Sequence, residues 1–173
     1  MVFEHNPAQR GIVLVGHGAV AKDCPRDLVA RFKALEGQRR ARGGEPSAEE
    51  IDLEQRIRRW PRTPANDPYR AGLEALAERM RAHVAGGRVA VAYNEFCAPT
   101  IDEAAAALVA DGVGVLTIVP SMLTPGGVHS EVEIPEAIER LRQAHPAVRI
   151  RYAWPFDLGV VAHVLAQHAE QFT

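Results

Sequence analysis

Apolar residues along this chain gather in four short runs that are separated by stretches with helical periodicity. The runs cover residues 11–16, 88–93, 113–120 and 148–152. Each run is rich in Val or Ile and reads as nearly continuously apolar, which is typical of parallel strands that helices cover on both faces. The pattern therefore predicts four buried parallel strands.

Capping residues mark the starts of two helices between the predicted strands. Asp67 and Pro68 favour a helix start, because Asp is a preferred N-cap and Pro is tolerated at the first helical position. Apolar residues continue at helical spacing from there to Val84. Thr100 and Glu103 have the spacing of a capping box and precede an alanine-rich segment. We expect one helix after each pair.

Two further helical segments follow, one starting near Pro135 and the other over residues 158–168. The alternation of strands and helices predicts an α/β fold. We expect a doubly wound, flavodoxin-like, four-stranded parallel sheet with helices on both faces.

One long segment, residues 37–66, interrupts this alternation after the first strand. It begins with the charged run GQRRARGGEPSAEE and ends in proline-rich sequence. Its middle carries Ile51, Leu53 and Ile57 along one side of a helix. We interpret the segment as a charged helical insertion, flanked by mobile connections, that forms a lid.

The composition is ordinary for a globular chain with one sizeable core. The chain has 173 residues, of which 47% are hydrophobic and 24% charged, so we expect residues 1–173 to form a single domain. Its net charge of −2 argues against general nucleic-acid binding, because phosphate contacts depend on Lys and Arg. It contains no run of 18 apolar residues, so no membrane span is expected.

Two further features bear on location. The N-terminal sequence MVFEHNPAQR has no apolar signal core. The two cysteines, Cys24 and Cys97, form neither a CxxC pair nor a disulfide framework. We therefore expect a cytoplasmic protein.

Chemically versatile side chains follow three of the predicted strands. His17 stands between glycines after the first strand, Glu95 follows the second, and His129 follows the third. In open α/β sheets, ligands bind beyond the carboxyl ends of the strands, which lie at one edge. Two imidazoles and a carboxylate commonly hold a divalent first-row transition metal with positions left open. Imidazole also titrates near neutral pH, so one of the two histidines could accept protons from a substrate.

Simpler interpretations compete for these residues. A histidine in a glycine turn is often only a hydrogen-bonding group, and Glu95 could pair with an arginine. Glu131 and Glu133 precede a helix, where the macrodipole favours acids, so we interpret both as helix-start residues. Cys24 and Cys97 are interpreted as small buried hydrophobes. The histidines that we place outside the site are His5, His83, His145, His163 and His168.

Several catalytic signatures are absent from the sequence. The run GHGAVAKD does not have the P-loop pattern, and GHG is not followed by the third glycine and the acid of a dinucleotide-binding fingerprint. No G-x-S-x-G elbow is present, and HSE does not have the spacing of a zinc-protease helix.

Three stretches occur in a specific order: LVGHG at 14–18, YNEFCAPTIDEAAAAL at 93–108 and IVPSMLTPGGVHSEVEIP at 118–135. Together they resemble the class II tetrapyrrole chelatase family, the sirohydrochlorin cobaltochelatases and ferrochelatases, in its short single-domain form. That family typically shows GHG after its first strand and a G-G-H-x-x-x-D-I-P-like run after a later one. Here EIP replaces DIP. The resemblance covers most of the chain outside roughly residues 20–66.

The resemblance implies a chelatase-like fold and the insertion of a divalent metal ion, Co²⁺, Fe²⁺ or Ni²⁺, into a sirohydrochlorin-type tetrapyrrole. By motif position, His17 and His129 would bind the incoming ion and accept pyrrole protons, and Glu95 would be a third contact or a proton relay. The metal is then a substrate, and no organic cofactor is expected. Short members of the family work as homodimers, so a homodimer is expected here.

Such tetrapyrroles carry several carboxylates, so we expect arginines at the mouth of the site. The insertion supplies Arg58, Arg59 and Arg62 as candidates for substrate binding, and Gly126 and Gly127 would let their loop approach a flat ligand. Further arginines in or near the insertion are Arg39, Arg40, Arg42 and Arg70. The alternative is that the arginines belong to a solvated charged helix.

Two departures from the family pattern leave other functions open. The connection from Ala19 to Pro68 is much longer than in short members, and SMLTP replaces the bulky residues common near the second histidine. A paralogue that binds or delivers a metal or a tetrapyrrole, without inserting one into the other, would retain the site residues. A histidine phosphatase is a third alternative, but Gly16 stands where the R-H-G motif has its arginine.

Overall fold

The sheet of this protein consists of four parallel strands. The computed structural model describes residues 9–84 and 86–172. We expected a cytoplasmic protein partly from the N-terminal sequence MVFEHNPAQR, and most of that sequence lies outside the described residues. The strands are β1 (Gln9–Gly16), β2 (Val89–Tyr93), β3 (Val113–Pro120) and β4 (Arg149–Tyr152). Their order is β2-β1-β3-β4 and every pairing is parallel. The predicted α/β fold with a four-stranded parallel sheet is confirmed.

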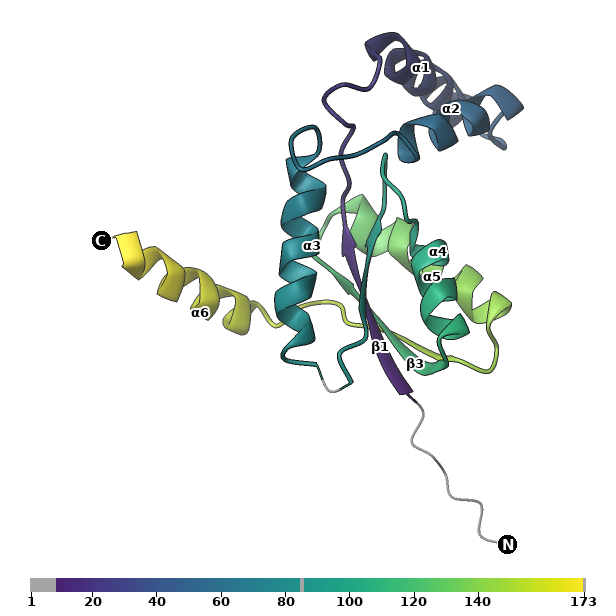
Figure 1. The fold of residues 1–173 in the computed structure, drawn as a ribbon. Coiled ribbons are helices and arrows are strands. Elements are labelled where there is room, and N and C mark those ends of the chain that lie inside the picture. The colour runs from purple at the N-terminus through teal and green to yellow at the C-terminus, as the bar shows by residue number, and fades with distance from the viewer. Residues whose placement is uncertain (1–8, 85, 173) are drawn as a thin grey trace, which may run out of the picture.

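Helices cover both faces of this sheet (Figure 1). α3 (Pro68–Arg81) lies on one face, and α4 (Ile101–Ala110) and α5 (Ile134–Ala144) lie on the other. Alternate residues of β1 supply the two cores. Val15 packs into the core beneath α4 and α5, and Leu14 packs into the core beneath α3.

The predicted helix caps are present. The Asp67 side chain accepts a hydrogen bond from the backbone N–H of Arg70 at 2.9 Å, with Pro68 in the first turn of α3. Thr100 and Glu103 form the reciprocal capping box that starts α4. Both helices therefore begin where the local sequence signals place them.

The two helices of the insertion lie above the carboxyl edge of the sheet (Figure 1). α1 (Arg26–Arg42) and α2 (Ala48–Arg58) pack together around a small core that includes Leu28 and Phe32. A helical insertion after β1 is confirmed, but our prediction that residues 37–42 belong to a connection is wrong, because they are the last turns of α1. Residues 37–42 read GQRRAR, in which Arg and Ala favour helix, and the Arg39 guanidinium donates to Glu50 of α2 at 2.8 Å.

The two ends of the insertion meet. The backbone N–H of Lys22 donates to the carbonyl of Asn66 at 2.9 Å. The side chain of Asn66 donates to the carboxylate of Asp23 and to the carbonyl of Pro61. The proline-rich flank is therefore folded back onto the start of the insertion.

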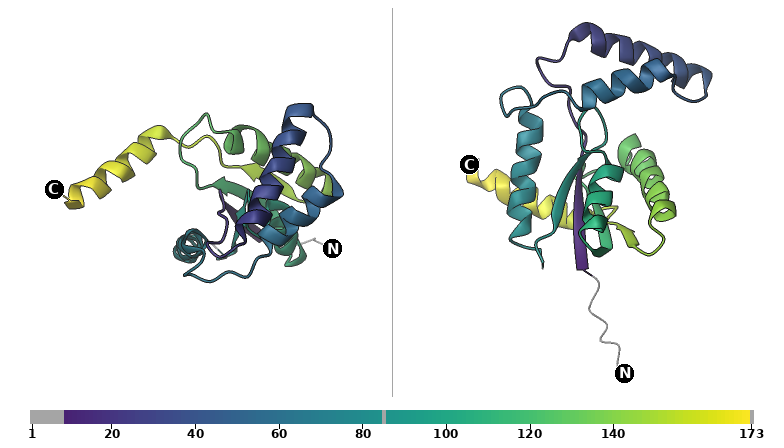
Figure 2. Two further views of the ribbon diagram at one scale, coloured as in Figure 1. Left: turned by 90° about the horizontal axis from the view of Figure 1, so that it is seen from above. Right: turned by 45° about the vertical axis from the view of Figure 1, so that its right-hand side comes forward.

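The last helix, α6 (Leu158–Ala169), leaves the body of the molecule and ends in a short 3₁₀ turn, η2 (Glu170–Phe172) (Figure 2). This confirms the predicted last helix, yet none of its residues is buried. The connection before it is held in place: the Trp154 ring stacks on Tyr152, with 6.4 Å between centroids, and its Nε1–H donates to Glu131 at 3.3 Å. None of the described helices is both long and apolar enough for a membrane span.

The turns that follow β1 and β2 touch each other at Gly18. Gly18 has a φ of +92°, and a Cβ there would lie 1.9 Å from the backbone oxygen of Glu95. Two hydrogen bonds join the same turns, from Asn94 N–H to the Gly16 carbonyl at 2.9 Å and from Glu95 N–H to the His17 carbonyl at 2.8 Å. Only glycine satisfies both the conformation and the space at this position.

Replacing Gly18 by alanine is expected to lower the free energy of unfolding by about 2–4 kcal/mol, because it adds left-handed strain and a clash with the Glu95 backbone. Denaturant titration followed by circular dichroism measures this quantity. Gly37→Ala is the matched control, since Gly37 lies within α1 with open space around its Cβ position. That change is expected to raise stability by about 1 kcal/mol. Equal stability of Gly18→Ala and the wild type would contradict the close approach.

Candidate metal centre

The three predicted site residues meet at the carboxyl edge of the sheet. His17 follows β1, Glu95 follows β2, and His129 begins η1 (His129–Glu133), a turn of π-helix that leads into α5. One potential ligand atom from each lies within 4.8 Å of the others. His17 Nε2 is 3.9 Å from a carboxylate oxygen of Glu95, and the two imidazole centroids lie 4.5 Å apart, edge to face. Two nitrogens and an oxygen so placed suit a first-row transition metal.

The backbone determines which nitrogen of His17 is available. Its Nδ1 lies 2.8 Å from the carbonyl oxygen of Gly18, so the neutral ring donates from Nδ1 and keeps a lone pair on Nε2. The backbone N–H of His17 donates to the Tyr69 hydroxyl at 2.8 Å. The His17 side chain is 44% exposed, compared with 17% for His129. His17 is therefore the ligand that an approaching molecule meets first.

A carboxylate holds the ring of His129. Glu133 Oε2 lies 2.6 Å from His129 Nδ1, at a separation of four residues along the chain. The side-chain amide of Asn94 contacts both groups. With Nδ1 engaged in this way, Nε2 of His129 is the nitrogen left for a metal ion.

The same contacts keep Glu133 charged. Burial acts to raise the pKa of Glu133, but the hydrogen bonds with His129 and Asn94 outweigh it and hold the pKa below its usual value. The guanidinium of Arg40, on α1, adds a positive charge 3.8 Å away. An ionised carboxylate therefore stands behind His129 at neutral pH.

Sequence reasoning missed Glu133 and Asn94. We interpreted Glu133 as a helix-start acid, although the H-x-x-x-E spacing places the two side chains on one side of a helical turn. Asn94 gave no such signal, because its contact depends on the packing of the β2 exit against η1. Glu131 fits its interpretation as a helix-start acid, because it lies in the first turn of η1. It also accepts hydrogen bonds from Trp154 Nε1 and from the backbone of Gly126, both at 3.3 Å.

The π-turn accommodates a proline at the start of α5. Pro135 has no N–H, and the N–H of Ile134 reaches back five residues to the carbonyl of His129. Ser130 is buried, and its carbonyl accepts a hydrogen bond from the Tyr152 hydroxyl at 2.8 Å. Turns of this kind occur often at functional sites. Here the turn is fixed against β4, so His129 is presented from a rigid base.

A cleft of about 390 Å³ opens between the insertion and the sheet edge. Six carboxylates and four guanidinium groups line it: those of Glu36, Glu54, Glu95, Asp102, Glu133, Glu136, Arg39, Arg40, Arg58 and Arg140. Each of these arginines already contacts an acidic side chain. The excess of acids makes the cleft more suitable for a cation than for a polycarboxylate. Glu95 and Glu133 connect this cleft to the metal site.

Two of the arginines predicted to bind substrate donate to backbone carbonyls of the protein, and of these Arg58 also lines the cleft. The Arg62 side chain is 1% exposed, and both of its terminal nitrogens donate to protein oxygens, so it presents no surface to a substrate. Arg58 donates to the carbonyls of Asn94 at 2.9 Å and Cys97 at 3.2 Å. Both arginines hold the loop that carries Glu95.

The other predicted substrate-binding residues are exposed. The Arg59 side chain is 70% exposed and lies 3.6 Å from Glu103. Gly126 and Gly127 are exposed in the turn that precedes η1, and Gly126 has a φ of +95°. Their roles in substrate binding stay predictions.

The two cysteines are not part of the site. Cys24 and Cys97 are buried, and burial raises the pKa of both thiols. Neither belongs to the group of potential ligands found among the described residues. This agrees with their interpretation as small buried hydrophobes.

The sequence matches a family of known proteins. The CbiX family model matches residues 65–171. The sirohydrochlorin ferrochelatase of Bacillus subtilis (strain 168) is 31% identical over 84 residues, which are 49% of this chain. Those residues span only 32% of that relative, so the match covers about a third of its length.

Solved structures share the fold. A cobalamin (vitamin B12) biosynthesis CbiX protein of Marinobacter aquaeolei VT8 has a TM-score of 0.54 at 21% identity, covering 95% of this chain and 99% of that one. The sirohydrochlorin chelatase SirB of Bacillus subtilis subspecies spizizenii, in complex with cobalt, has a TM-score of 0.52 at 24% identity, covering 94% and 50%. SirB of Bacillus subtilis with Fe³⁺ has a TM-score of 0.54 at 24% identity, covering 91% and 45%.

The matched family model includes Glu95 and His129 and begins well after His17. It spans more than half of the 173 residues. The resemblance drawn from the sequence motifs is thus confirmed, and the chain belongs to the CbiX family.

Proposed function

We propose that this protein inserts a divalent metal ion into a sirohydrochlorin-type tetrapyrrole. The observation that carries the proposal is the convergence of His17, Glu95 and His129 at one point of the sheet edge. Relatives support it, because the matched Bacillus subtilis protein is a sirohydrochlorin ferrochelatase and the two SirB structures contain cobalt or Fe³⁺. Co²⁺, Fe²⁺ and Ni²⁺ all accept imidazole and carboxylate ligands. The ion is a substrate of the reaction.

Metal insertion exchanges one divalent ion for two pyrrole N–H protons. Two imidazole nitrogens and a carboxylate oxygen hold the ion and leave coordination positions for the nitrogens of the macrocycle. As the ion moves into the ring, the Nε2 atoms that it leaves can accept the two protons. No thiolate joins these ligands among the described residues, so the ion is not retained by a cysteine cage.

Glu133 assists both steps from behind His129. Its carboxylate fixes the orientation of the ring and keeps a proton on Nδ1, so that Nε2 faces the reaction. When Nε2 gains a proton, the same carboxylate offsets the positive charge of the ring. Glu133 is therefore a positioning residue and not a ligand in this scheme.

The surroundings of the site suggest separate approaches for the two substrates. The acidic cleft reaches the site through Glu95 and suits an arriving cation. Outside its lining, Leu123, Val128 and Val132 expose apolar side chains within six residues of His129. An apolar surface of this kind suits the face of a flat macrocycle. Gly126 and Gly127 lie in the same stretch. Of the three arginines predicted to bind substrate, Arg59 is the exposed one.

We further propose that the protein works as a homodimer with residues 1–173 of each copy forming one domain. α6 buries no residue, and Leu158, Val160, Val164 and Leu165 are each more than half exposed. Several apolar side chains exposed together on one helix are typical of an interaction surface. The chain covers only 50% of the SirB structure, so a second copy would supply a comparable length of chain.

His17→Ala and His129→Ala are each expected to slow Co²⁺ insertion into sirohydrochlorin at least about 100-fold, because each change removes both a ligand and a proton acceptor. The absorbance change on metallation gives the rate. His83→Ala, at an exposed position beyond α3, is the control and should keep the wild-type rate. Unchanged rates in both site variants would overturn the assignment. Tight stoichiometric binding by the wild type, with no acceleration, would instead support the carrier alternative.

Glu133→Gln is expected to weaken Co²⁺ binding and to slow metallation by about 10–100-fold, because the neutral amide accepts a weaker hydrogen bond from the His129 ring and does not offset its charge. Co²⁺ titration and the metallation assay measure the two effects. Glu133→Asp should recover part of the rate, since the charge is kept. Glu131→Gln is the control, because Glu131 contacts Trp154 and not His129. A wild-type rate for Glu133→Gln would show that the carboxylate is dispensable.

The wild-type protein is expected to have twice the 18.9 kDa mass of one chain when measured by light scattering after size exclusion. Leu165→Glu should shift it to the single-chain mass, because it places a charge on the apolar surface of α6. Ile51→Glu is the control, since Ile51 is also exposed on a helix but lies on α2. A monomeric wild type would count against the homodimer. A Leu165→Glu variant that forms a dimer of unchanged stability would count against α6 as the interface.

A further inference from the structure

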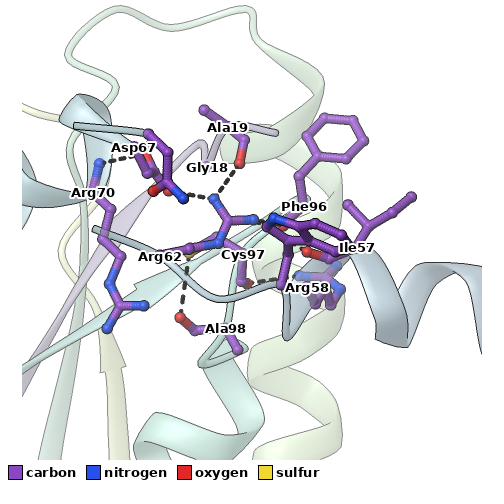
Figure 3. A network of polar contacts seen from close by, with 12 residues as sticks. Gly18, Ala19, Ile57, Arg58, Arg62, Asp67, Arg70, Phe96, Cys97 and Ala98 are labelled. Carbon is purple, nitrogen blue, oxygen red and sulfur yellow. Dashed lines mark hydrogen bonds and ion pairs between the residues drawn. The ribbon is translucent and has the colours of Figure 1, made fainter. Parts of the chain in front are cut away.

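The buried side chain of Arg62 makes hydrogen bonds with both the insertion and the turns that carry the candidate metal site (Figure 3). One terminal nitrogen of its guanidinium donates to the carbonyl of Ala19 at 2.7 Å and to the carboxylate of Asp67. The other donates to the carbonyl of Ile57 at 3.2 Å and to that of Phe96. One side chain therefore joins the end of α2 and the start of α3, each five residues away, to two turns that are distant in the sequence.

Two of these acceptors belong to the turns that carry the metal-site residues. Ala19 is two residues after His17, and Phe96 directly follows Glu95. The other two belong to the surrounding frame, since Ile57 lies in the last turn of α2 and Asp67 caps the N-terminus of α3. Arg62 thus ties both site turns to the insertion and to a helix of the sheet layer.

The backbone at Phe96 depends on contacts from the insertion. Its φ is +56°, a left-handed conformation that is unfavourable for a residue with a side chain. The Phe96 ring packs edge-on against Phe32 of α1, with 6.5 Å between centroids, and its carbonyl accepts from Arg62. Two contacts from the insertion therefore act on the residue next to Glu95.

Arginine is the side chain that fits this position. Its planar fork presents donors in fixed and separate directions, whereas lysine has a single nitrogen with three donors. Lysine could stay close to Asp67 and keep its charge paired, but one nitrogen cannot serve both arms of the fork. The contacts to Ile57 and Phe96 are the ones that a lysine would lose.

We propose that Arg62 is a positioning residue that sets the relative placement of His17 and Glu95, and so of the metal ligands. The proposal rests on the function proposed above, because it assigns Arg62 a part in the same site. Arg62 contacts neither the ion nor the tetrapyrrole in this scheme. It acts through the backbone of the two site turns and makes the metal site sensitive to the state of the insertion.

The test compares Arg62→Lys with the wild type and with Arg56→Lys, the same change at an exposed arginine of α2 that pairs with Asp52. The readouts are the visible absorption spectrum of bound Co²⁺, the Co²⁺ dissociation constant, and kcat and KM for metallation of sirohydrochlorin. In Arg62→Lys we expect an altered Co²⁺ spectrum, Co²⁺ binding weakened about 10-fold and kcat lowered about 10–100-fold, with KM for the tetrapyrrole unchanged. Arg56→Lys should keep the wild-type spectrum and kcat.

Three results would overturn the proposal. A lower melting temperature with wild-type Co²⁺ spectrum and kcat would show that Arg62 serves stability alone. A raised KM for the tetrapyrrole with wild-type Co²⁺ binding would show that it binds substrate. If Arg62→Lys does not fold, Asp67→Asn is measured in its place, because it keeps the α3 cap and releases one constraint on the guanidinium. A wild-type spectrum and kcat in folded Asp67→Asn would equally count against positioning.

The Co²⁺ spectrum separates this proposal from the proposed function. If the wild type binds Co²⁺ but does not accelerate metallation, the chelatase proposal fails. The spectra of the wild type and Arg62→Lys still decide whether Arg62 positions the ligands.

Discussion

Where β1 and β2 end, the backbone of Gly18 passes the carbonyl of Glu95 so closely that no side chain fits between them. Neighbouring parallel strands bring their exits to one edge, but at the ordinary spacing of the sheet. Because Gly18 has no Cβ, the two exits can approach closely, and the hydrogen bond from the Glu95 N–H to the His17 carbonyl then joins them. The candidate ligands His17 and Glu95 therefore lie on a joined pair of turns, and η1, which follows β3, adds the third candidate. The rest of the site is built around this junction.

Local patterns predicted the strands, α3, α4 and α6 because these elements carry their own signals. Continuous apolar runs, a capping box and an Asp-Pro pair each act over a few residues. The C-terminal half of α1 has no such signal. It is held by Arg39, whose guanidinium donates at 2.8 Å to Glu50, an acid that is 3% exposed on α2. A charged run that is paired with an acid on another helix looks, in the sequence alone, like a solvated connection.

The predicted site residues also follow from a general rule, whereas the missed ones depend on tertiary packing. His17, Glu95 and His129 could be predicted because a general rule brings strand exits to one edge. The role of Asn94 could not, since it depends on which side chains face each other across two loops. Arg62 looked like a surface cation because it stands in a charged, proline-rich stretch. Its burial follows only from the closing of four segments around it.

The two histidines reach the same point with different support. His17 is bonded to a carbonyl and is largely open, whereas His129 is backed by an ionised carboxylate and mostly covered. The two candidate ligands therefore differ in their access to solvent.

The hydrogen bond between Lys22 and Asn66 brings the two ends of the insertion together, so both ends leave the α/β core at nearly the same place. A segment of this kind can be gained, lost or exchanged in evolution without changing the register of the sheet. The part that would leave with it is Arg62, and with Arg62 the contacts to Ala19 and Phe96. A relative without the insertion must therefore hold its two site turns by another device. Grafting the insertion onto such a relative would transfer a wall of the cleft and a brace for the metal ligands as one piece.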